Sequence, residues 1–362
     1  MVLLSWRRWD ALGSQWKRRR GDLPKCGGSR ATSALEVPFE GGSIRQDMRV
    51  DQREDRAVGA LLGVHAGDCL GATLEFSDWA TVKGLYPDGL RNIVGGGPFG
   101  WPAGHATDDT DLTRAVVLAY TRPVTGEVVR DAASYMLDWY EGRWPGRVPG
   151  SRPDDVGGAT AAALQTYQRT RDPFTSGAGA GQAGNGSLMR AIPTAVFGRS
   201  AVERISESIS ISAITHDDRR CTISCAAYNE IAAALIDGAS VSDAVGHGVD
   251  VALKSGSAGV TAALRAGTSL SLQAAASSGI SEVPGTGYVL DSLTLAVSAL
   301  SDQRGLEAAL IDIVRLGYDT DTNAAIAGGL LGACYGAAAI PHRWLELLQF
   351  GDEFRQAVRR RT

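Results

Sequence analysis

The sequence predicts an all-α fold in which residues 53–362 form one compact domain. Apolar residues recur at steps of three and four in segment after segment, which is the period of a helix face. Runs of alternating β-branched residues are scarce, and no alternation of strands with helices indicates a parallel sheet. Apolar residues make up 44% of the chain and charged residues 21%, and 362 residues can bury a substantial core.

Helices are expected over nine segments, and the first of them is unusual in its small side chains. Ala57, Ala60, Gly63 and Gly67 recur there at steps of three or four, which leaves a flat stripe that another helix can approach closely. Glycine within a helix costs roughly 1 kcal/mol relative to alanine, so its frequency indicates that close packing or loop geometry is required. The expected helices, in chain order, span residues 56–71, 112–120, 132–140, 158–168, 201–214, 221–236, 290–300, 306–316 and 324–339.

Residues 1–52 differ from the rest of the chain and are expected to form a basic, disordered N-terminal extension. Residues 1–34 carry eight Lys or Arg against two acids and contain no apolar stretch long enough for a secretory signal. We interpret the tract at 17–20 as part of a solvated tail, with a nucleic-acid-binding arm and a targeting segment as the alternatives.

Charge, cysteine content and hydropathy bear on the compartment and the partners. The net charge of −4 provides no global basic field to attract nucleic acid. Five cysteines spread through a long chain do not resemble a disulfide framework, which indicates a reducing, cytoplasmic environment. The charge-free stretch at 324–340 is short for a bilayer and follows Asp319 and Asp321, so we expect a buried helix and no membrane partner.

The first chemical motif lies just before the helix expected at 112–120. Asp108 and Asp109 are adjacent and are flanked by the hydroxyls of Thr107 and Thr110. One Asp would suffice as a helix cap, whereas two carboxylates with two hydroxyls suit a hard cation that prefers oxygen ligands. Taken alone, the motif leaves both interpretations open.

A second motif at residues 317–323 repeats these ingredients before the Ala- and Gly-rich helix near the C-terminus. Asp319 and Asp321 can point the same way if the segment turns, and Gly317 permits the turn. Two such motifs at two helix N-termini could build an all-oxygen site from opposite sides of a helix bundle. Their pairing predicts a two-metal hydrolase.

The third motif is the glycine-rich run at 184–190, which follows the flexible run at 177–181. Backbone N–H groups in such a run can hold phosphate oxygens when a helix follows. A simple loop is the alternative, although Asn185 between two glycines, followed by Ser187 and Arg190, favours an anion site.

Five sequence blocks together resemble those of the ADP-ribosylglycohydrolases. The blocks are residues 67–71 with Glu75 and Phe76, residues 107–110, 155–157, 184–190 and 319–323, and a weaker sixth spans 212–217. They follow the order of the family and extend over the chain from Ala57 to Trp344. The resemblance implies a compact orthogonal helix bundle, in agreement with the all-α prediction.

The resemblance also implies a role for each matching position. Glu75, Asp109 and Asp321 are the expected catalytic residues, with Glu75 or a metal-bound Asp accepting the proton. Two Mg²⁺ ions, which Mn²⁺ could replace, would be held by Thr107, Asp108, Asp109, Asp319, Asp321 and Thr322. Substrate contacts are expected from Asp155 and Gly157 at the distal ribose, from the diphosphate loop Gly184, Asn185, Gly186, Ser187, Leu188, Met189 and Arg190, and from His216 near the same pocket.

The implied function is Mg²⁺-dependent hydrolysis of the glycosidic bond between ADP-ribose and a modified target, most simply an arginine on a protein. Serine, O-acyl and nucleobase linkages would present the same ADP-ribose and stay open, as does a small-molecule ADP-ribose conjugate in place of the protein. A metal-dependent phosphoester hydrolase and a non-catalytic ADP-ribose-binding protein are the alternatives from other classes. ADP-ribose is the expected product, and nucleic acid is expected only as a modified substrate.

Some positions near the blocks carry separate expectations. We expect Asp111 to be a solvated residue in the first turn of its helix, with metal ligation as the alternative. Trp139 and Trp144 are expected in the core, whereas Phe99 and Trp101 are expected at the pocket rim.

Two further departures concern a tyrosine and the cysteines. Tyr318 stands where the family often has a second Gly, which is expected to alter the mouth of the site. Cys69, Cys221 and Cys225 are expected to pack in the core, because a structural zinc site needs four ligands and the last two have only His216 nearby.

Overall fold

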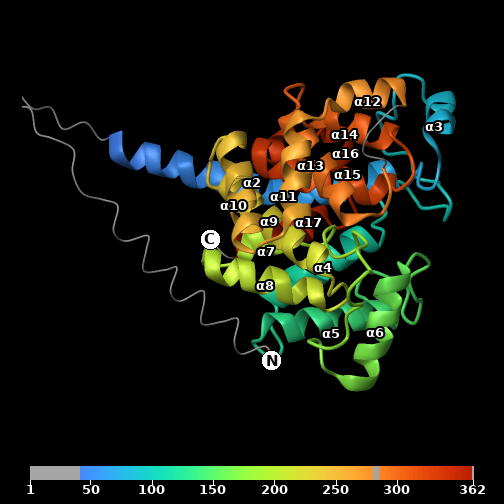
Figure 1. Ribbon diagram of the computed structural model, residues 1–362, viewed down its shortest axis with the longest axis vertical. Coiled ribbons are helices and arrows are strands. Elements are labelled where there is room, and N and C mark those ends of the chain that lie inside the picture. Colours follow the sequence, from blue (N-terminus) through green and yellow to red (C-terminus); the bar gives the residue numbers. More distant parts are fainter. Residues whose placement is uncertain (1–40, 280–284, 361–362) are drawn as a thin grey trace, which may run out of the picture. The chain divides into compact units, whose positions relative to one another are not determined.

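The computed structural model describes residues 41–279 and 285–360, and all regular elements in these ranges are helices (Figure 1). The all-α prediction is therefore confirmed. The helices of five or more residues, in chain order, are α2 (Gly41–Gly71), α3 (Trp79–Leu85), α4 (Asp108–Thr121), α5 (Val128–Tyr140), α6 (Gly158–Thr170), α7 (Pro193–Phe197), α8 (Ala201–Ala213), α9 (Arg219–Ile236), α10 (Val241–Lys254), α11 (Ala258–Ser269), α12 (Leu272–Ser278), α13 (Val289–Ser301), α14 (Leu306–Arg315), α15 (Thr320–Tyr335) and α17 (Gly351–Arg359).

Residues 45–362 form one compact unit, in which α9, α13, α14 and α15 surround the apolar core. Figure 1 shows α13, α14 and α15 packed beside one another. Residues 1–40, which make up most of the predicted basic extension, lie outside the described residues. Helix α2 begins at Gly41, within the range predicted for that extension.

Helices α2 and α15 cross with their backbones in contact. A Cβ atom added at Gly63 would overlap the carbonyl of Gly328, and one added at Gly328 would overlap the carbonyl of Gly63. The close approach predicted for the first helix is therefore present. The α2 residues that make the approach are spaced by four and differ in part from those expected: Gly59, Gly63, Gly67 and Gly71.

The crossing brings the C-terminal end of α2 to the first turn of α15. The hydroxyl of Thr320 donates a hydrogen bond of 2.7 Å to the carbonyl of Gly71. Gly317 and Tyr318 precede α15 with φ angles of +82° and +66°, so the chain turns sharply before the helix begins. Gly317 therefore makes the turn that the sequence predicted.

Six of these helices were not predicted, namely α3, α7, α10, α11, α12 and α17. Residues 237–289 carry no expected helix, whereas the structure has α10, α11 and α12 between Val241 and Ser278. Helix α10 contains two interior glycines, and a Cβ at Gly248 would lie 2.7 Å from Cδ1 of Ile231 on α9. Packing against α9 requires a residue of low helix propensity at this position, which obscured the helical pattern.

The Ala- and Gly-rich stretch at 324–340 lies mainly in α15, whose residues 320–333 are buried in the core. This burial agrees with the expectation of a buried helix. In the part of the chain that the structure describes, every helix is too short or too polar to span a bilayer.

Candidate active site

A cavity of about 600 Å³ opens where the first turns of α4 and α15 meet the segment after α2. Its walls bring together residues from blocks that lie far apart in the sequence. Of the expected metal ligands it exposes four, namely Asp108, Asp319, Asp321 and Thr322. The other expected site residues on its walls are Glu75, Asp155, Gly157, Gly184, Asn185, Gly186, Met189 and His216.

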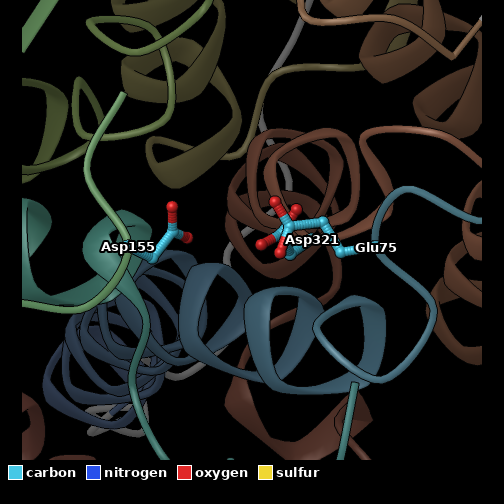
Figure 2. Close-up of side chains that lie close together, drawn as sticks. All are labelled: Glu75, Asp155 and Asp321. Atoms are coloured by element: carbon cyan, nitrogen blue, oxygen red, sulfur yellow. The ribbon is translucent and has the colours of Figure 1, made fainter. Parts of the chain in front are cut away.

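Three carboxylates from three segments form the closest group in this cavity. One oxygen from each of Glu75, Asp155 and Asp321 lies within 4.8 Å of the other two. Figure 2 shows these side chains, contributed by the segment after α2, the loop before α6 and the start of α15. We call them, together with Asp108, Asp109 and Asp319, the acidic cluster.

Asp109 joins the two Asp-rich motifs. Its Oδ2 atom accepts hydrogen bonds from the hydroxyl of Thr107 at 3.3 Å and from that of Thr322 at 3.4 Å. Thr107 also caps α4, since its Oγ1 accepts a hydrogen bond from the backbone N–H of Asp109. Two motifs more than 200 positions apart in the chain therefore meet at one buried carboxylate.

Asp68 supports this meeting point from α2. It is fully buried, and its Oδ2 atom accepts hydrogen bonds from the backbone N–H of Thr107 and from the hydroxyl of Thr110. The sequence analysis quoted Asp68 within a block but gave it no role. A lone charged residue inside an Ala-, Gly- and Leu-rich helix was the available signal, because such a residue is buried only when it is paired.

Burial raises the pKa of the carboxyls in this region, and their mutual repulsion adds to the rise. Burial and the charges of Asp155 and Asp319 raise the pKa of Glu75 to about 8. Burial and the charge of Asp319 raise the pKa of Asp155 to about 6. The same two causes place the pKa well above the usual range at Asp108, Asp109 and Asp321.

The acidic cluster has no cationic partner within the described residues. None of the ion pairs found there involves any of its six carboxylates. Oδ1 of Asp109 and Oε2 of Glu75 are buried and have no hydrogen-bond partner in the same part of the chain. Buried carboxylate oxygens that lack a hydrogen-bond partner are suitable ligands for a hard divalent cation, so the cluster could hold metal.

The glycine-rich run at 184–190 connects the cavity to the second Asp motif. The side-chain amide of Asn185 donates to Oδ2 of Asp319 at 2.7 Å and to the hydroxyl of Ser292 at 3.0 Å. The backbone N–H of Asn185 donates to the carbonyl of Gly287. These three bonds fix the run against α13 and α15, so its position relative to the acidic cluster is set by the fold.

His216 packs directly against this run. A Cβ added at Gly186 would lie 2.9 Å from its Cε1 atom, and one added at Gly184 would lie 3.3 Å from its Nε2 atom. Burial and the nearby Arg190 lower the pKa of His216 to about 3, so the imidazole is neutral at physiological pH. The two glycines are therefore needed for the close approach of a neutral ring to the cavity wall.

Three expected substrate residues lie outside the walls of this cavity. Ser187, Leu188 and Arg190 are buried. The Arg190 guanidinium donates to the carbonyl of Gly186 and to the hydroxyl of Thr215, the latter at 2.6 Å. The Arg190 side chain thus holds the glycine-rich run in place from the protein interior. The helix that follows the run is the short α7.

The expectation that Asp111 lies in solvent was wrong. The structure buries Asp111, and its carboxylate accepts hydrogen bonds from the indole N–H groups of Trp139 at 3.0 Å and Trp144 at 2.9 Å. Arg147 forms a salt bridge with it at 2.8 Å. The error arose because these donors come from α5 and the loop after it, which no local pattern near residue 111 reveals.

A second, smaller cavity of about 240 Å³ adjoins the larger one, and Asp108 and Asp155 line both. Its walls include Trp101, His105 and Arg147. Trp101, expected at the rim of the substrate pocket, thus lies on the wall of this smaller cavity and not on that of the larger one. The Trp101 ring stacks on that of His105 with centroids 4.6 Å apart. Phe99 contacts the Trp101 ring from the adjacent turn.

Tyr318 and Phe76 both line the larger cavity. Both have left-handed backbone angles, and they are 48% and 67% exposed. The backbone N–H of Phe76 donates to the carbonyl of Tyr318 at 2.7 Å, and that of Tyr318 donates to the carbonyl of Ser77 at 2.6 Å. Tyr318 therefore forms part of the mouth of the site.

The cysteines near the site are buried and free. Cys221 donates to the carbonyl of Gly184, and Cys69 donates to the carbonyl of His105. Cys225 packs against Ser187. Over residues 41–279 and 285–360, the one group of side chains close enough to share a metal ion consists of carboxylates and includes no cysteine or histidine.

Comparisons with known proteins agree with this arrangement. The family model for ADP-ribosylglycohydrolase matches residues 49–362. An ADP-ribosylarginine hydrolase of Pseudomonas putida (strain GB-1) is 30% identical over 84% of this chain and 77% of its own length. An ADP-ribosyl-[dinitrogen reductase] glycohydrolase of Rhodospirillum rubrum is 27% identical over 83% of this chain and 92% of its own. A solved structure described as an ADP-ribosylglycohydrolase-related protein complex superposes with a TM-score of 0.69 at 29% identity, over 85% of this chain and 97% of that one.

The fold and these relatives define an enzyme that hydrolyses glycosyl bonds. The chain belongs to the ADP-ribosylglycohydrolase family, which confirms the resemblance read from its five sequence blocks.

Proposed function

We propose that this enzyme uses Mg²⁺ to hydrolyse the bond between ADP-ribose and a modified arginine on a protein. The observation that carries the proposal is one cavity of about 600 Å³ lined both by five carboxylates of the acidic cluster and by Gly184, Asn185 and Gly186. A carboxylate site beside a glycine-rich backbone suits a metal-assisted reaction on a diphosphate-containing substrate. The arginine linkage is supported by the relative named as an ADP-ribosylarginine hydrolase.

Six side chains would hold the ions, and other residues of the chain fix the position of these six. When bound, the ions would act as Lewis acids that stabilise developing negative charge. Asp68 orients Thr107, and Asn185 orients Asp319 through its hydrogen bond to Oδ2. The proposed ligands are Thr107, Asp108, Asp109, Asp319, Asp321 and Thr322.

We assign proton transfer to Oε2 of Glu75, with a carboxylate of the Asp motifs as the alternative base. Oε2 of Glu75 is buried without a hydrogen-bond partner among the described residues, and Glu75 lies on the cavity wall, so this oxygen is free to accept a proton from water. Water would attack the anomeric carbon and pass a proton to Glu75 while the bond to the arginine nitrogen breaks and the arginine leaves. Neighbouring carboxylates such as Asp155 would stabilise the oxocarbenium-like state. Asp155 and Gly157 would contact the distal ribose, and neutral His216 would contact the substrate without adding charge.

The deciding experiment measures release of free ADP-ribose from arginine-, serine- and acyl-linked substrates, with Mg²⁺ and with chelator. We expect release from the arginine linkage alone and only with Mg²⁺. Release that persists in chelator would refute the metal dependence. Release of AMP instead of ADP-ribose would show cleavage of the diphosphate and refute the glycosidic reaction.

Two substitutions test the metal ligands. Asp109→Ala and Asp321→Ala should abolish release while the protein stays folded, because each removes an oxygen ligand from the acidic cluster. Asp250→Ala, which removes an exposed carboxylate from α10, is the matched control and should keep wild-type activity. Wild-type activity in either folded site variant would refute the metal assignment.

A further inference from the structure

The smaller cavity adjoins the larger one at the two carboxylates that they share. Its volume is about 240 Å³, and Asp108 and Asp155 belong to the walls of both. This inference rests on the proposed function. If ADP-ribose fills the larger cavity with its distal ribose at Asp155, the bond to the target points toward the shared wall. The smaller cavity is then the open space beyond the bond that breaks.

We propose that the smaller cavity is the subsite for the side chain of the modified target, and that Asp154 selects a cationic guanidinium there. Asp154 lies on the wall of this cavity, is exposed to solvent and is absent from the wall of the larger one. Its carboxylate therefore meets the leaving group without meeting ADP-ribose. Serine and acyl leaving groups carry no positive charge, so this subsite favours arginine-linked substrates.

The charges of the cavity support a cationic occupant. Arg147 is already paired with the buried Asp111, and the guanidinium of Arg152 lies over the Tyr140 ring at 5.8 Å. Asp154, by contrast, takes part in none of the ion pairs of the described residues. It is therefore an exposed carboxylate on this wall that is open to a cationic partner.

The aromatic wall supports a planar occupant. Trp101 and His105 both line the cavity, and their stacked rings form a flat aromatic wall. Guanidinium groups stack on aromatic faces, and tryptophan is the best partner for such contacts.

The back of the cavity is rigid, so the subsite is formed before the target binds. Asp111 holds Trp139, Trp144 and Arg147 together, and all four side chains line the cavity. Arg147 also donates to the carbonyl of Ala106, directly before the Thr107 cap of α4. The wall of the subsite and the first Asp motif are therefore one connected structure, which places the leaving group at a fixed position relative to Asp108.

The test compares full-length wild-type protein with Asp154→Lys and with Asp250→Lys, which makes the same charge change at an exposed site on α10. Two quantities are measured in Mg²⁺: kcat/KM for an ADP-ribosylarginine peptide, and the Kd of free ADP-ribose. We expect Asp154→Lys to lower kcat/KM roughly tenfold or more, since a tenfold change corresponds to about 1.4 kcal/mol. The Kd of ADP-ribose should stay unchanged, and Asp250→Lys should match wild type in both measurements.

A second measurement does not depend on turnover. Agmatine, a guanidinium probe, is titrated into wild-type protein saturated with Mg²⁺ and ADP-ribose and followed by ligand-observed NMR. Its urea analogue, which keeps the ammonium group and lacks only the guanidinium charge, is the comparison. We expect wild type to bind agmatine in preference to the urea analogue and Asp154→Lys to lose that preference.

The outcomes separate the subsite from the proposed function. Selective agmatine binding without release of ADP-ribose from any linkage would leave the subsite standing and refute the proposed function. Normal release with an unchanged kcat/KM in Asp154→Lys would refute the subsite alone. An equal loss of ADP-ribose affinity in that variant would also overturn the subsite, because Asp154 would then act on the other half of the substrate.

Discussion

Gly63→Ala tests whether backbone contact between α2 and α15 holds the acidic cluster together. Alanine is favoured over glycine inside a helix by about 1 kcal/mol. The new Cβ would, however, overlap the Gly328 carbonyl, and a backbone atom cannot rotate aside as a side chain can. Overpacking of this kind costs up to about 3 kcal/mol. The difference is a net destabilisation of roughly 2 kcal/mol, which lowers the Tm by about 3 °C for a domain of this size.

Gly84→Ala in α3 is the matched control. Gly84 is exposed, its backbone angle is ordinary, and an added Cβ would meet no atom within 4 Å. The same substitution should therefore stabilise the protein by about 0.5 kcal/mol. Thermal melts of both variants are measured in the same buffer with excess Mg²⁺. If Gly63→Ala raises the Tm as Gly84→Ala does, the two backbones are not in contact and the reasoning fails.

Three further predictions concern pH, the buried ion pair and backbone strain. Burial and nearby charges raise the pKa of Glu75 from 4.5 in the unfolded chain to about 8 in the folded protein. Its contribution to stability is therefore complete below pH 4.5 and is lost as the pH rises through about 8. The Tm measured in chelator should fall across this window, and a flat profile would contradict the shift. Arg147→Met leaves Asp111 buried without its cation and should cost about 3 kcal/mol in denaturant unfolding, whereas a loss below about 1 kcal/mol would mean that the indole donors suffice. Tyr318→Gly should be more stable than Tyr318→Ala by about 1 kcal/mol, because both remove the ring but only glycine relieves the left-handed strain; equal melting temperatures would argue against strain at this residue.

The sequence allowed most of the helices to be predicted, because their apolar periodicity is local. The first helix could also be assigned a close partner, since small residues at helical spacing have few other uses. The identity of that partner could not be predicted, and the residues in contact were partly misassigned. Gly59 and Gly71, at the ends of the contact, lie opposite α15 residues more than 240 positions away, and only the folded chain shows this pairing.

The residues of the candidate site were likewise predictable only where the signal is local in the sequence. Asp108 and Asp321 could be proposed as metal ligands because hydroxyls and a second carboxylate surround each of them within a few residues. Asp111 sits one helical turn after Asp108 and was indistinguishable from an ordinary first-turn acid. Its true environment depends on Trp139, Trp144 and Arg147, which the chain reaches only after another helix and a loop.

Burying the carboxylates of the site costs folding free energy, and the nearby helix N-termini offset this cost only in part. The N-termini of α4 and α15 favour negative charge near Asp109 and Asp321, but each helix end is equivalent to about half a charge. Six carboxyl groups exceed what two helix ends can neutralise, so in the absence of a cation some must stay protonated, as the raised pKa values of Glu75 and Asp155 indicate. A bound cation releases those protons and adds binding free energy to the folded state. Removal of metal should therefore lower the stability of the protein together with its activity, whereas in a protein that bound ADP-ribose without metal a chelator would change neither.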